Sequence, residues 1–160
     1  MDRDIFLRIE ELKKKLQGDL KYDSVTRVIY STDASVYKET PLCVVWPKNK
    51  DDIKEVLKFA AAEKVGVIPR AGGTSLAGQV VGNGIVLDVS RYMNRIIEID
   101  TERKTVRVEP GVILDHLNIF LRTYGLFFGP ETSTANRCNI GGMVGNNACG
   151  LHSLVYGSTR

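Results

Sequence analysis

A strand–helix–strand pattern that leads into a glycine-rich loop constrains the fold of this chain more than any other feature. Residues 42–46 are apolar and predict a short buried strand, and the best-defined amphipathic helix begins at Asp51–Asp52 and ends near Gly66. Val67–Ile68 and Gly84–Ser90 predict two further short strands. Because strands that are apolar throughout are typical of parallel sheets, this order predicts a small parallel βαβ unit.

The sequence on either side of this unit has a different character. Residues 5–16 place apolar side chains on one face of a predicted helix, whereas residues 19–43 are polar and irregular. Further on, the alternating segments 95–99 and 105–109 predict an antiparallel hairpin, and residues 112–123 predict an amphipathic helix. We therefore predict an α+β fold whose two lobes meet near residue 90.

Composition excludes several classes of function. The 22 basic and 19 acidic residues leave a net charge of +3, and no basic run or aromatic–basic stripe suggests nucleic acid. No apolar stretch approaches the roughly 20 residues of a membrane span. The N-terminus lacks the pattern of a signal peptide. The sequence therefore predicts a cytoplasmic protein with no membrane span and no nucleic-acid partner.

Cysteine and histidine are scarce. Cys43, Cys138 and Cys149 form no CxxC pair and leave an odd count, so neither a disulfide scaffold nor a zinc site is expected. We expect all three to be reduced and buried, as packing residues rather than redox thiols. His116 is expected at the solvent edge of its helix, whereas His152 fits a surface loop or a place near a ligand. No metal centre is predicted.

The first segment with ligand-binding character is Pro69–Gly78, which follows a strand and holds three glycines and two hydroxyl side chains. Glycine permits positive φ and close approach of the backbone to a ligand, so consecutive N–H groups can converge on phosphate oxygens. Thr74 and Ser75 add hydroxyl donors, and Arg70 adds charge. The segment has neither the Lys of a Walker A loop nor the spacing of a Rossmann fingerprint. By composition alone, a phosphate loop and a glycine-rich turn without a ligand are equal alternatives.

A second such segment, residues 139–150, contains four glycines and three asparagines. This composition is poor for a helix or a strand unless the backbone lies against something flat or anionic. Just upstream, residues 129–134 predict a turn with exposed hydroxyl groups. Two ligand-type loops joined by a hairpin and a helix suggest two lobes that close on one extended cofactor. Elsewhere, Asp88 and Glu109 stand at strand ends, where a carboxylate usually caps a turn.

These segments resemble PCMH-type (vanillyl-alcohol-oxidase-like) FAD-binding domains in order and spacing. The motifs that carry the resemblance are Val67–Gly78, Ile85–Ser90, Val108–Gly111 and Pro130–Gly150. The chain is most similar to the group that comprises D-lactate dehydrogenase, D-2-hydroxyglutarate dehydrogenase and the flavin-binding polypeptide of glycolate oxidase, over roughly residues 22–160. In these motifs, the amino-acid sequence of the chain looks most like that of long bacterial members that carry a C-terminal iron–sulfur module. The resemblance implies a first FAD-binding lobe at 1–90 and a second, incomplete lobe at 91–160.

The resemblance also implies which residues contact FAD. The first segment would wrap the pyrophosphate through backbone N–H groups, and the second would line the ribityl chain and the isoalloxazine edge. Relatives that link FAD covalently through this loop carry His at the position of Thr74, so non-covalent FAD is expected. No catalytic residue and no metal ligand is implied within this chain. The implied cofactor contacts are Pro69, Arg70, Ala71, Gly72, Gly73, Thr74, Ser75, Leu76, Gln79, Pro130, Glu131, Thr132, Ser133, Gly141, Gly142, Gly145, Asn146, Asn147, Gly150, Tyr156 and Gly157.

The activity implied is that of an FAD-dependent dehydrogenase or oxidase. Its substrate would be a small 2-hydroxy acid such as D-lactate, glycolate or D-2-hydroxyglutarate, with hydride transfer to flavin N5. In such relatives the substrate cap and the catalytic base follow the segment seen here, so the chain is expected to be an N-terminal fragment that is inactive alone. An iron–sulfur cluster would belong to a missing C-terminal module. Uncovered apolar surface predicts a homo-oligomer. The alternatives are the same FAD module in a different flavoenzyme, and a non-catalytic nucleotide-binding fragment.

Overall fold

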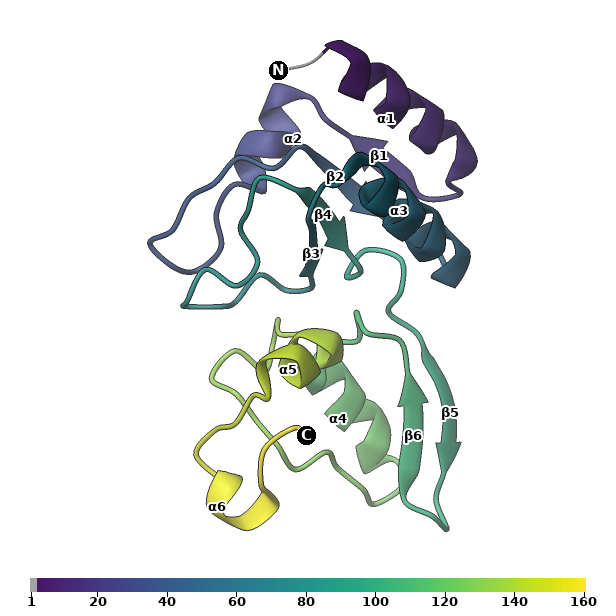
Figure 1. The fold of residues 1–160 in the computed structure, drawn as a ribbon. Coiled ribbons are helices and arrows are strands. Elements are labelled where there is room, and N and C mark those ends of the chain that lie inside the picture. Colours follow the sequence, from purple (N-terminus) through teal and green to yellow (C-terminus); the bar gives the residue numbers. More distant parts are fainter. Residues whose placement is uncertain (1–2) are drawn as a thin grey trace. The chain divides into compact units, whose positions relative to one another are not determined.

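The chain forms two compact units in a computed structural model that describes residues 3–160 (Figure 1). Unit 1 comprises the residues up to Arg70 together with Ser75–Tyr92. Unit 2 comprises Met93–Arg160 together with the short loop segment Ala71–Thr74. By its contacts this segment therefore belongs to unit 2, although it interrupts unit 1 in the sequence.

Unit 1 is built on a four-stranded sheet with the strand order β1-β2-β4-β3. Its strands are β1 (Asp19–Lys21), β2 (Cys43–Trp46), β3 (Val67–Arg70) and β4 (Ile85–Asp88). Strands β2, β4 and β3 run parallel, as predicted, and β1 pairs antiparallel with β2. The sequence did not predict that β4 lies between the two strands that precede it in the chain.

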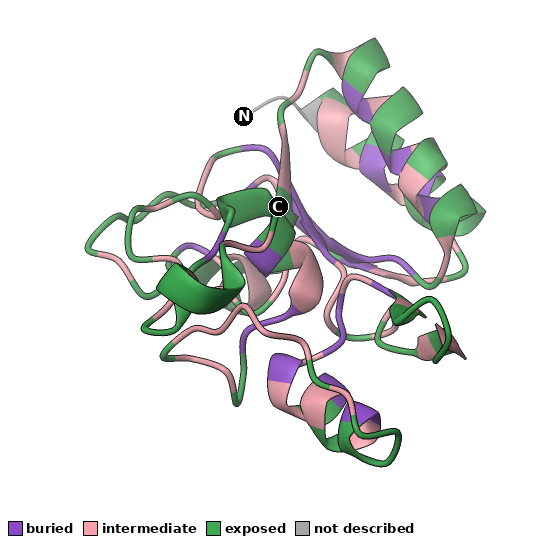
Figure 2. Ribbon diagram, turned by 90° about the horizontal axis from the view of Figure 1, so that it is seen from below, coloured by how far each residue is buried: buried purple, intermediate pink, exposed green. Residues whose placement is uncertain are grey.

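Two helices, α1 (Arg3–Lys15) and α3 (Lys50–Glu63), pack together against one face of this sheet. Alternate side chains of the central strands face them, so that Val45 joins Ile9 and Val56 in one buried cluster. On the other face, Val44, Trp46 and Val86 form a second cluster, and partly buried Tyr30, Ile68 and Tyr92 pack against it. Because both faces are covered, β2 and β4 are buried at every position (Figure 2), which explains their uninterrupted apolar sequence.

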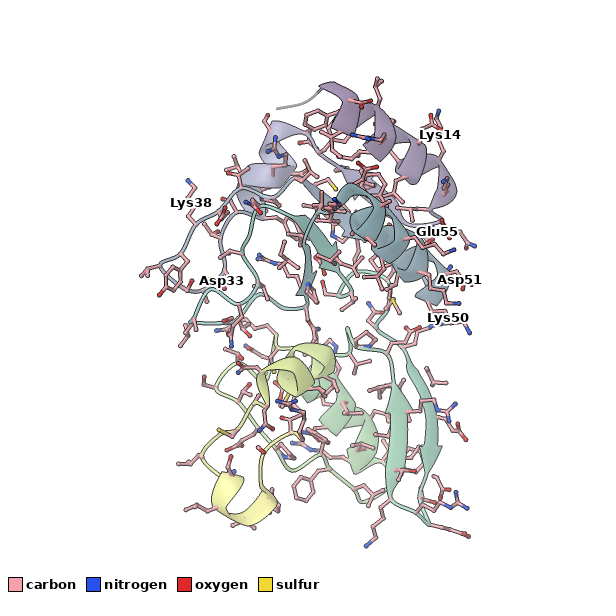
Figure 3. The ribbon with its side chains drawn as sticks, in the orientation of Figure 1. Lys14, Asp33, Lys38, Lys50, Asp51 and Glu55 are labelled. Atoms are coloured by element: carbon pink, nitrogen blue, oxygen red, sulfur yellow. The ribbon has the colours of Figure 1, made fainter. Side chains whose placement is uncertain are left out.

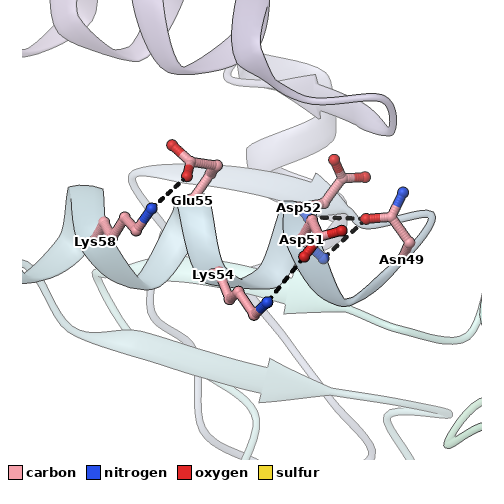
Figure 4. Close-up of polar contacts among 6 residues, drawn as sticks. All are labelled: Asn49, Asp51, Asp52, Lys54, Glu55 and Lys58. Atoms are coloured by element: carbon pink, nitrogen blue, oxygen red, sulfur yellow. Dashed lines mark hydrogen bonds and ion pairs between the residues drawn. The ribbon is translucent and has the colours of Figure 1, made fainter.

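Helix α3 begins with a side-chain cap at Asn49. The Asn49 Oδ1 accepts hydrogen bonds from the backbone N–H groups of Asp51 and Asp52 at 2.9 and 3.0 Å (Figure 4). The Asp51 and Asp52 carboxylates also lie at the positive end of the helix dipole, as the sequence indicates. The helix ends at Glu63, and Lys64 closes it in the left-handed conformation with φ 55°.

The prediction of irregular structure over residues 19–43 is wrong at two places. Asp19–Lys21 forms the edge strand β1, and Ser24–Ile29 forms a short helix, α2. Asp23 caps α2, since its Oδ1 accepts from the Thr26 backbone N–H at 2.9 Å. An Asp three residues before a Thr was the available signal for this helix. Val25, Val28 and Ile29 follow the spacing of an apolar helix face, but six residues are too few for this pattern to stand out, and none of these side chains is buried.

Unit 2 begins with the predicted antiparallel hairpin. Its strands are β5 (Ile96–Asp100) and β6 (Thr105–Val108), with a register shift between Ile96 and Glu98. Helix α4 (Leu114–Arg122) follows, and its apolar face forms a cluster with both strands. The cluster consists of Val112, Leu117 and Leu121, with Ile96, Ile99, Val106 and Val108 packed against it.

The rest of unit 2 contains two short helices, α5 (Ile140–Asn146) and α6 (Ser153–Tyr156). The prediction that residues 139–150 are poor helix material is therefore wrong for α5. Burial of Met143 against Leu114 and other apolar side chains holds this turn of helix in place. Tertiary packing here overrides the low helix propensity of glycine and asparagine.

Candidate functional site

The Arg70 side chain, at the end of β3, contacts residues of unit 1. Its Nη1 donates to the backbone carbonyl of Thr32 at 2.8 Å and makes a longer contact with that of Val80 at 3.4 Å. The guanidinium also lies 5.0 Å above the centre of the Tyr30 ring. Arg70 thus ties the loop to the segment that includes Asp33 and Lys38, which Figure 3 labels.

A buried polar network supports the Tyr30 ring on which Arg70 lies. The Tyr30 hydroxyl donates to Asp88 Oδ2 at 2.6 Å and accepts from Trp46 Nε1 at 2.9 Å. Burial, together with the hydrogen bond to the Asp88 carboxylate, raises the pKa of Tyr30 to about 12. Asp88 Oδ1 accepts from the backbone N–H and the hydroxyl of Ser90. The expected role of Asp88 in capping a turn is confirmed.

The segment Ala71–Thr74 is the part of the loop that lies in unit 2. A Cβ on Gly72 would come within 2.5 Å of the Arg137 carbonyl oxygen, so only glycine fits here. Gly73 has φ +63°, in the left-handed region. Within residues 3–160, the backbone N–H groups of Gly72, Gly73 and Thr74 donate to no other group. Successive unpaired backbone donors beside a left-handed glycine are the features from which anion-binding turns are built.

The remainder of the loop, Ser75–Gln79, returns to unit 1 as a tight turn. The Ser75 hydroxyl donates to Gln79 Oε1 and accepts from the Ala77 N–H. Gly78 has φ +71°, and a Cβ there would lie 2.6 Å from the ring of Tyr37. The hydrogen bonds of Ser75 stabilise this turn, and Leu76 within it is exposed.

The sequence-predicted residues of the second segment lie together in unit 2. Glu131 Oε1 lies 2.8 Å from His152 Nδ1, and a Cβ on Gly150 would touch the Glu131 carbonyl oxygen at 2.5 Å. The Tyr156 side chain lies against Gly129. Thr132 Oγ1 is 3.2 Å from the buried Cys138 Sγ. The segments 129–134 and 150–156, which are separate in sequence, are therefore one packed surface.

Helix α5 requires glycine at one of its candidate positions. A Cβ on Gly141 would meet Pro110 at 2.6 Å, whereas one on Gly142 would make ordinary contact with Ala71 at 3.4 Å. Gly145 has open space around it. Asn147 ends the helix in the left-handed conformation, and its Oδ1 accepts from the Arg160 N–H at 3.0 Å. The exposed face of α5 that carries Gly142 and Gly145 is the part available to a ligand.

Asn139 lies beside the loop but was not among the predicted cofactor contacts. It precedes α5 and is only 4% exposed, and its Nδ2 donates to the Gly111 carbonyl oxygen at 2.7 Å. Its Oδ1 faces Gly72 and has no hydrogen-bond partner among residues 3–160. The contact spans 28 residues, so no local pattern could have predicted it.

The cysteine prediction needs one correction. All three thiols are free, and Cys43 and Cys138 are buried, but Cys149 is exposed. In the turn after α5, Ala148 points into the core and Cys149 therefore points away from it. His116 is exposed on α4, as predicted.

The family model that describes an FAD binding domain matches residues 41–160, three quarters of the chain. The chain belongs to this FAD-binding family. The match includes both glycine-rich segments and the elements that connect them.

Curated relatives are named as dehydrogenases and oxidases of 2-hydroxy acids. The chain is 44% identical over 155 residues to D-2-hydroxyglutarate dehydrogenase of Escherichia coli, covering 94% of this chain and 15% of that protein. It is 35% identical to the glycolate oxidase polypeptide GlcD of Bacillus subtilis, covering 95% of this chain and 33% of that polypeptide. The chain therefore spans between about one seventh and one third of the length of these relatives.

Solved structures confirm the PCMH-type FAD-binding fold. Alkyldihydroxyacetonephosphate synthase superposes with a TM-score of 0.84 at 22% identity, over 99% of this chain and 32% of that one. p-Cresol methylhydroxylase superposes with a TM-score of 0.75 at 17% identity, over 92% and 30%. At these identities the likeness shows the fold alone. In the part of the chain that the structure describes, no helix is both long and apolar enough to cross a membrane.

Proposed function

We propose that the chain binds FAD without a covalent bond, through the loop that follows β3. The observation that carries this proposal is the set of three unpaired backbone N–H groups at Gly72, Gly73 and Thr74. They would donate to the oxygens of the cofactor's diphosphate, and the Thr74 hydroxyl would add a fourth donor. Thr74 has no imidazole with which to form a bond to the flavin.

The other cofactor contacts expected from the sequence are part of the same proposal. Pro130–Ser133 and the exposed face of α5 would line the ribityl chain and the isoalloxazine ring. Their support is that both belong to unit 2, as does the diphosphate segment Ala71–Thr74. Arg70 would act by holding the loop in place, because its guanidinium is bonded to the Thr32 carbonyl.

We further infer that the chain is the flavin-binding part of a dehydrogenase or oxidase of a D-2-hydroxy acid. This inference is supported by the names of relatives at 44% and 35% identity. Bound FAD would supply the hydride acceptor, at flavin N5. The substrate cap, the catalytic base and any iron–sulfur module would lie in the portion of such proteins that this chain does not span. The cytoplasmic location expected from the sequence belongs to this proposal too.

A second candidate is another flavoenzyme chemistry on the same fold. It is favoured by the superposition on alkyldihydroxyacetonephosphate synthase, whose coverage and TM-score exceed those of p-cresol methylhydroxylase. Sequence identity favours the first candidate, since 44% to a curated dehydrogenase is twice the 22% to the synthase. The substrate specificity of a longer polypeptide containing this chain would decide between them.

Titration of the purified chain with FAD tests the proposal. We expect FAD to raise the melting temperature, to co-elute in gel filtration, and to be released in full on denaturation. Gly73→Val should abolish these effects, because a β-branched side chain does not tolerate φ +63°. Gly66→Ala is the matched control, since a Cβ at Gly66 has nothing within 4 Å. A colourless wild-type chain whose melting temperature does not respond to FAD would refute the proposal.

A further inference from the structure

Helix α5 carries the exposed face that we propose to lie against the flavin, yet its sequence is a poor one for a helix. It has seven residues, and three of them are glycines. Helices this short are marginal in water, and glycine inside a helix destabilises it further. Since Met143 is its one buried side chain, the helical conformation of α5 depends on what holds its two ends.

The N-terminal end of α5 is held by backbone groups. The Ile140 N–H donates to the Val112 carbonyl at 2.9 Å, and the Gly141 N–H donates to the Pro110 carbonyl at 2.8 Å. Asn139 adds no side-chain cap to this end.

The C-terminal end of α5 forms a Schellman motif around Asn147, which has φ 47°. The Asn147 N–H donates to the Val144 carbonyl at 3.2 Å, and the Ala148 N–H donates to the Met143 carbonyl at 2.8 Å. Ala148 and Met143 belong to one buried cluster, which is the apolar contact typical of this motif. Glycine usually takes the left-handed position, and asparagine takes it at a greater cost, so this end needs further support.

Thr159 and Arg160 supply this support after the chain has passed through α6. Thr159 donates twice to the Ala148 carbonyl oxygen, from its N–H at 3.0 Å and from its Oγ1 at 2.6 Å. The Arg160 N–H donates to Asn147 Oδ1 at 3.0 Å. These three hydrogen bonds fix the two residues that end α5, and we call them the Thr159 clamp.

The diphosphate segment Ala71–Thr74 lies near the other end of α5. Gly72 lies against the Arg137 carbonyl oxygen and the Asn139 side chain, both of which precede the helix. The Thr159 clamp acts on the residues that follow the helix. A change in the clamp should therefore affect contacts of α5 with a flavin ring more than contacts of the loop with a diphosphate.

We propose that Thr159 is a positioning residue for the flavin-binding face of α5. Its two hydrogen bonds fix the Ala148 carbonyl and keep Asn147 in the left-handed conformation. Helix α5 then stays formed, with Gly142 and Gly145 exposed to the ligand. The part of this inference that concerns FAD rests on the proposed function, whereas the effect of the clamp on α5 does not.

Amide exchange measured by NMR on the ligand-free chain tests the clamp. Thr159→Val removes the hydroxyl and keeps the shape of the side chain. We expect the Ala148 amide to exchange about fivefold faster in this variant, because the end of α5 opens more often. Thr159→Ser keeps the hydroxyl and should restore the wild-type rate. If Thr159→Val does not fold, Thr159→Ala removes the same hydrogen bond. An Ala148 exchange rate that does not respond to loss of the hydroxyl would overturn the inference.

Binding of FAD and of ADP separates positioning from general stability, because ADP carries the diphosphate without the flavin ring. FAD should bind Thr159→Val between about twofold and fivefold more weakly, since affinity falls with the population of helical α5. The visible absorption band of the bound flavin should also shift toward that of free FAD. ADP should bind the variant and the wild type equally. Unchanged FAD binding would contradict the inference, as would equal weakening of FAD and ADP.

Thr123→Val is the matched control. Thr123 lies at the end of α4 in the same unit, and its Oγ1 also donates to a backbone carbonyl, that of Phe120, at 2.7 Å. This variant should change neither Ala148 exchange nor the affinity for FAD, and effects as large as those of Thr159→Val would refute the role of Thr159. A wild-type chain that binds neither FAD nor ADP would instead defeat the proposed function, and the exchange result would still decide whether Thr159 clamps α5.

Discussion

At the scale of single residues, Asp52 shows how one buried carboxylate organises unit 1. It is 3% exposed and accepts hydrogen bonds from the backbone N–H groups of Gln17, Gly18 and Lys48, at 2.9 to 3.0 Å. These bonds join the segment after α1 to the start of α3. The sequence indicated Asp52 only as an acidic residue at a helix start.

Asp52→Ala should therefore destabilise the chain by about 2 kcal/mol or more, because it leaves three donors without their acceptor. Urea unfolding measures this change. Asp51→Ala is the control, since the neighbouring Asp51 is exposed and its carboxylate pairs with Lys54 on the surface (Figure 4). Equal losses of stability in the two variants would contradict the assignment.

Gly72 has to be glycine because its Cα lies close to the Arg137 carbonyl oxygen. Gly72→Ala should weaken FAD binding by roughly tenfold or more. The new Cβ would lie 2.5 Å from the Arg137 carbonyl oxygen, so the loop would have to move. Isothermal titration with FAD measures this loss. Gly142→Ala, whose Cβ would make an ordinary 3.4 Å contact with Ala71, should fold normally and tests whether α5 faces the cofactor.

At the scale of elements, the ends of the β5–β6 hairpin are held by one ion pair. Glu109 accepts from the Arg95 backbone N–H at 2.9 Å and from Arg95 Nη2 at 2.8 Å. The hydrogen bond from the Arg95 side chain holds the pKa of the Glu109 carboxyl below its usual value, although burial opposes this. The carboxylate is thus a structural acceptor between two strand ends.

This pKa shift predicts how stability depends on pH. A carboxyl whose pKa is lower in the folded state stabilises the fold above the pKa of the unfolded chain, near 4.3. The contribution is lost as the pH falls through the folded-state pKa. Glu109→Gln should therefore lower the free energy of unfolding at pH 7, and the difference from wild type should shrink by pH 3. Glu102→Gln, in the exposed hairpin turn, should match wild type at both values.

At the scale of the whole molecule, each unit leaves apolar side chains exposed. In unit 2, one group of them lies at α6 and consists of Leu151, Leu154 and Val155. In unit 1, one group of them lies on α2 and consists of Val25, Val28 and Ile29. Clustered exposed apolar side chains of this kind favour association between molecules.

We expect the chain to self-associate through the α6 cluster, since Leu154 is fully exposed. Leu154→Ser with Val155→Ser should shift sedimentation toward the monomer at a given concentration and leave the melting temperature unchanged. Val25→Ser with Ile29→Ser on α2 is the matched comparison. A wild-type chain that sediments as a monomer at every concentration would contradict this prediction.

Several elements could be predicted because their signals are local. The acidic start of α3, the apolar strands β2 and β4, and the alternating strands of the β5–β6 hairpin are each visible within a few residues. The likeness of the glycine-rich segments to FAD-binding domains is equally a property of short ordered motifs, and the family match confirms it. Helix α2 and the short strand β1 were missed because too few residues carry their pattern.

The sequence by itself determined the family and the order of most elements. The tertiary structure alone decided that β4 lies between β2 and β3, and that buried Met143 makes a helix of a segment rich in glycine and asparagine. It also decided that the Asn139 side chain donates to the Gly111 carbonyl oxygen and faces Gly72, which are 28 and 67 residues away in the sequence. Local patterns report propensity and amphipathicity, whereas these features depend on contacts between distant residues, which exist only once the chain has folded.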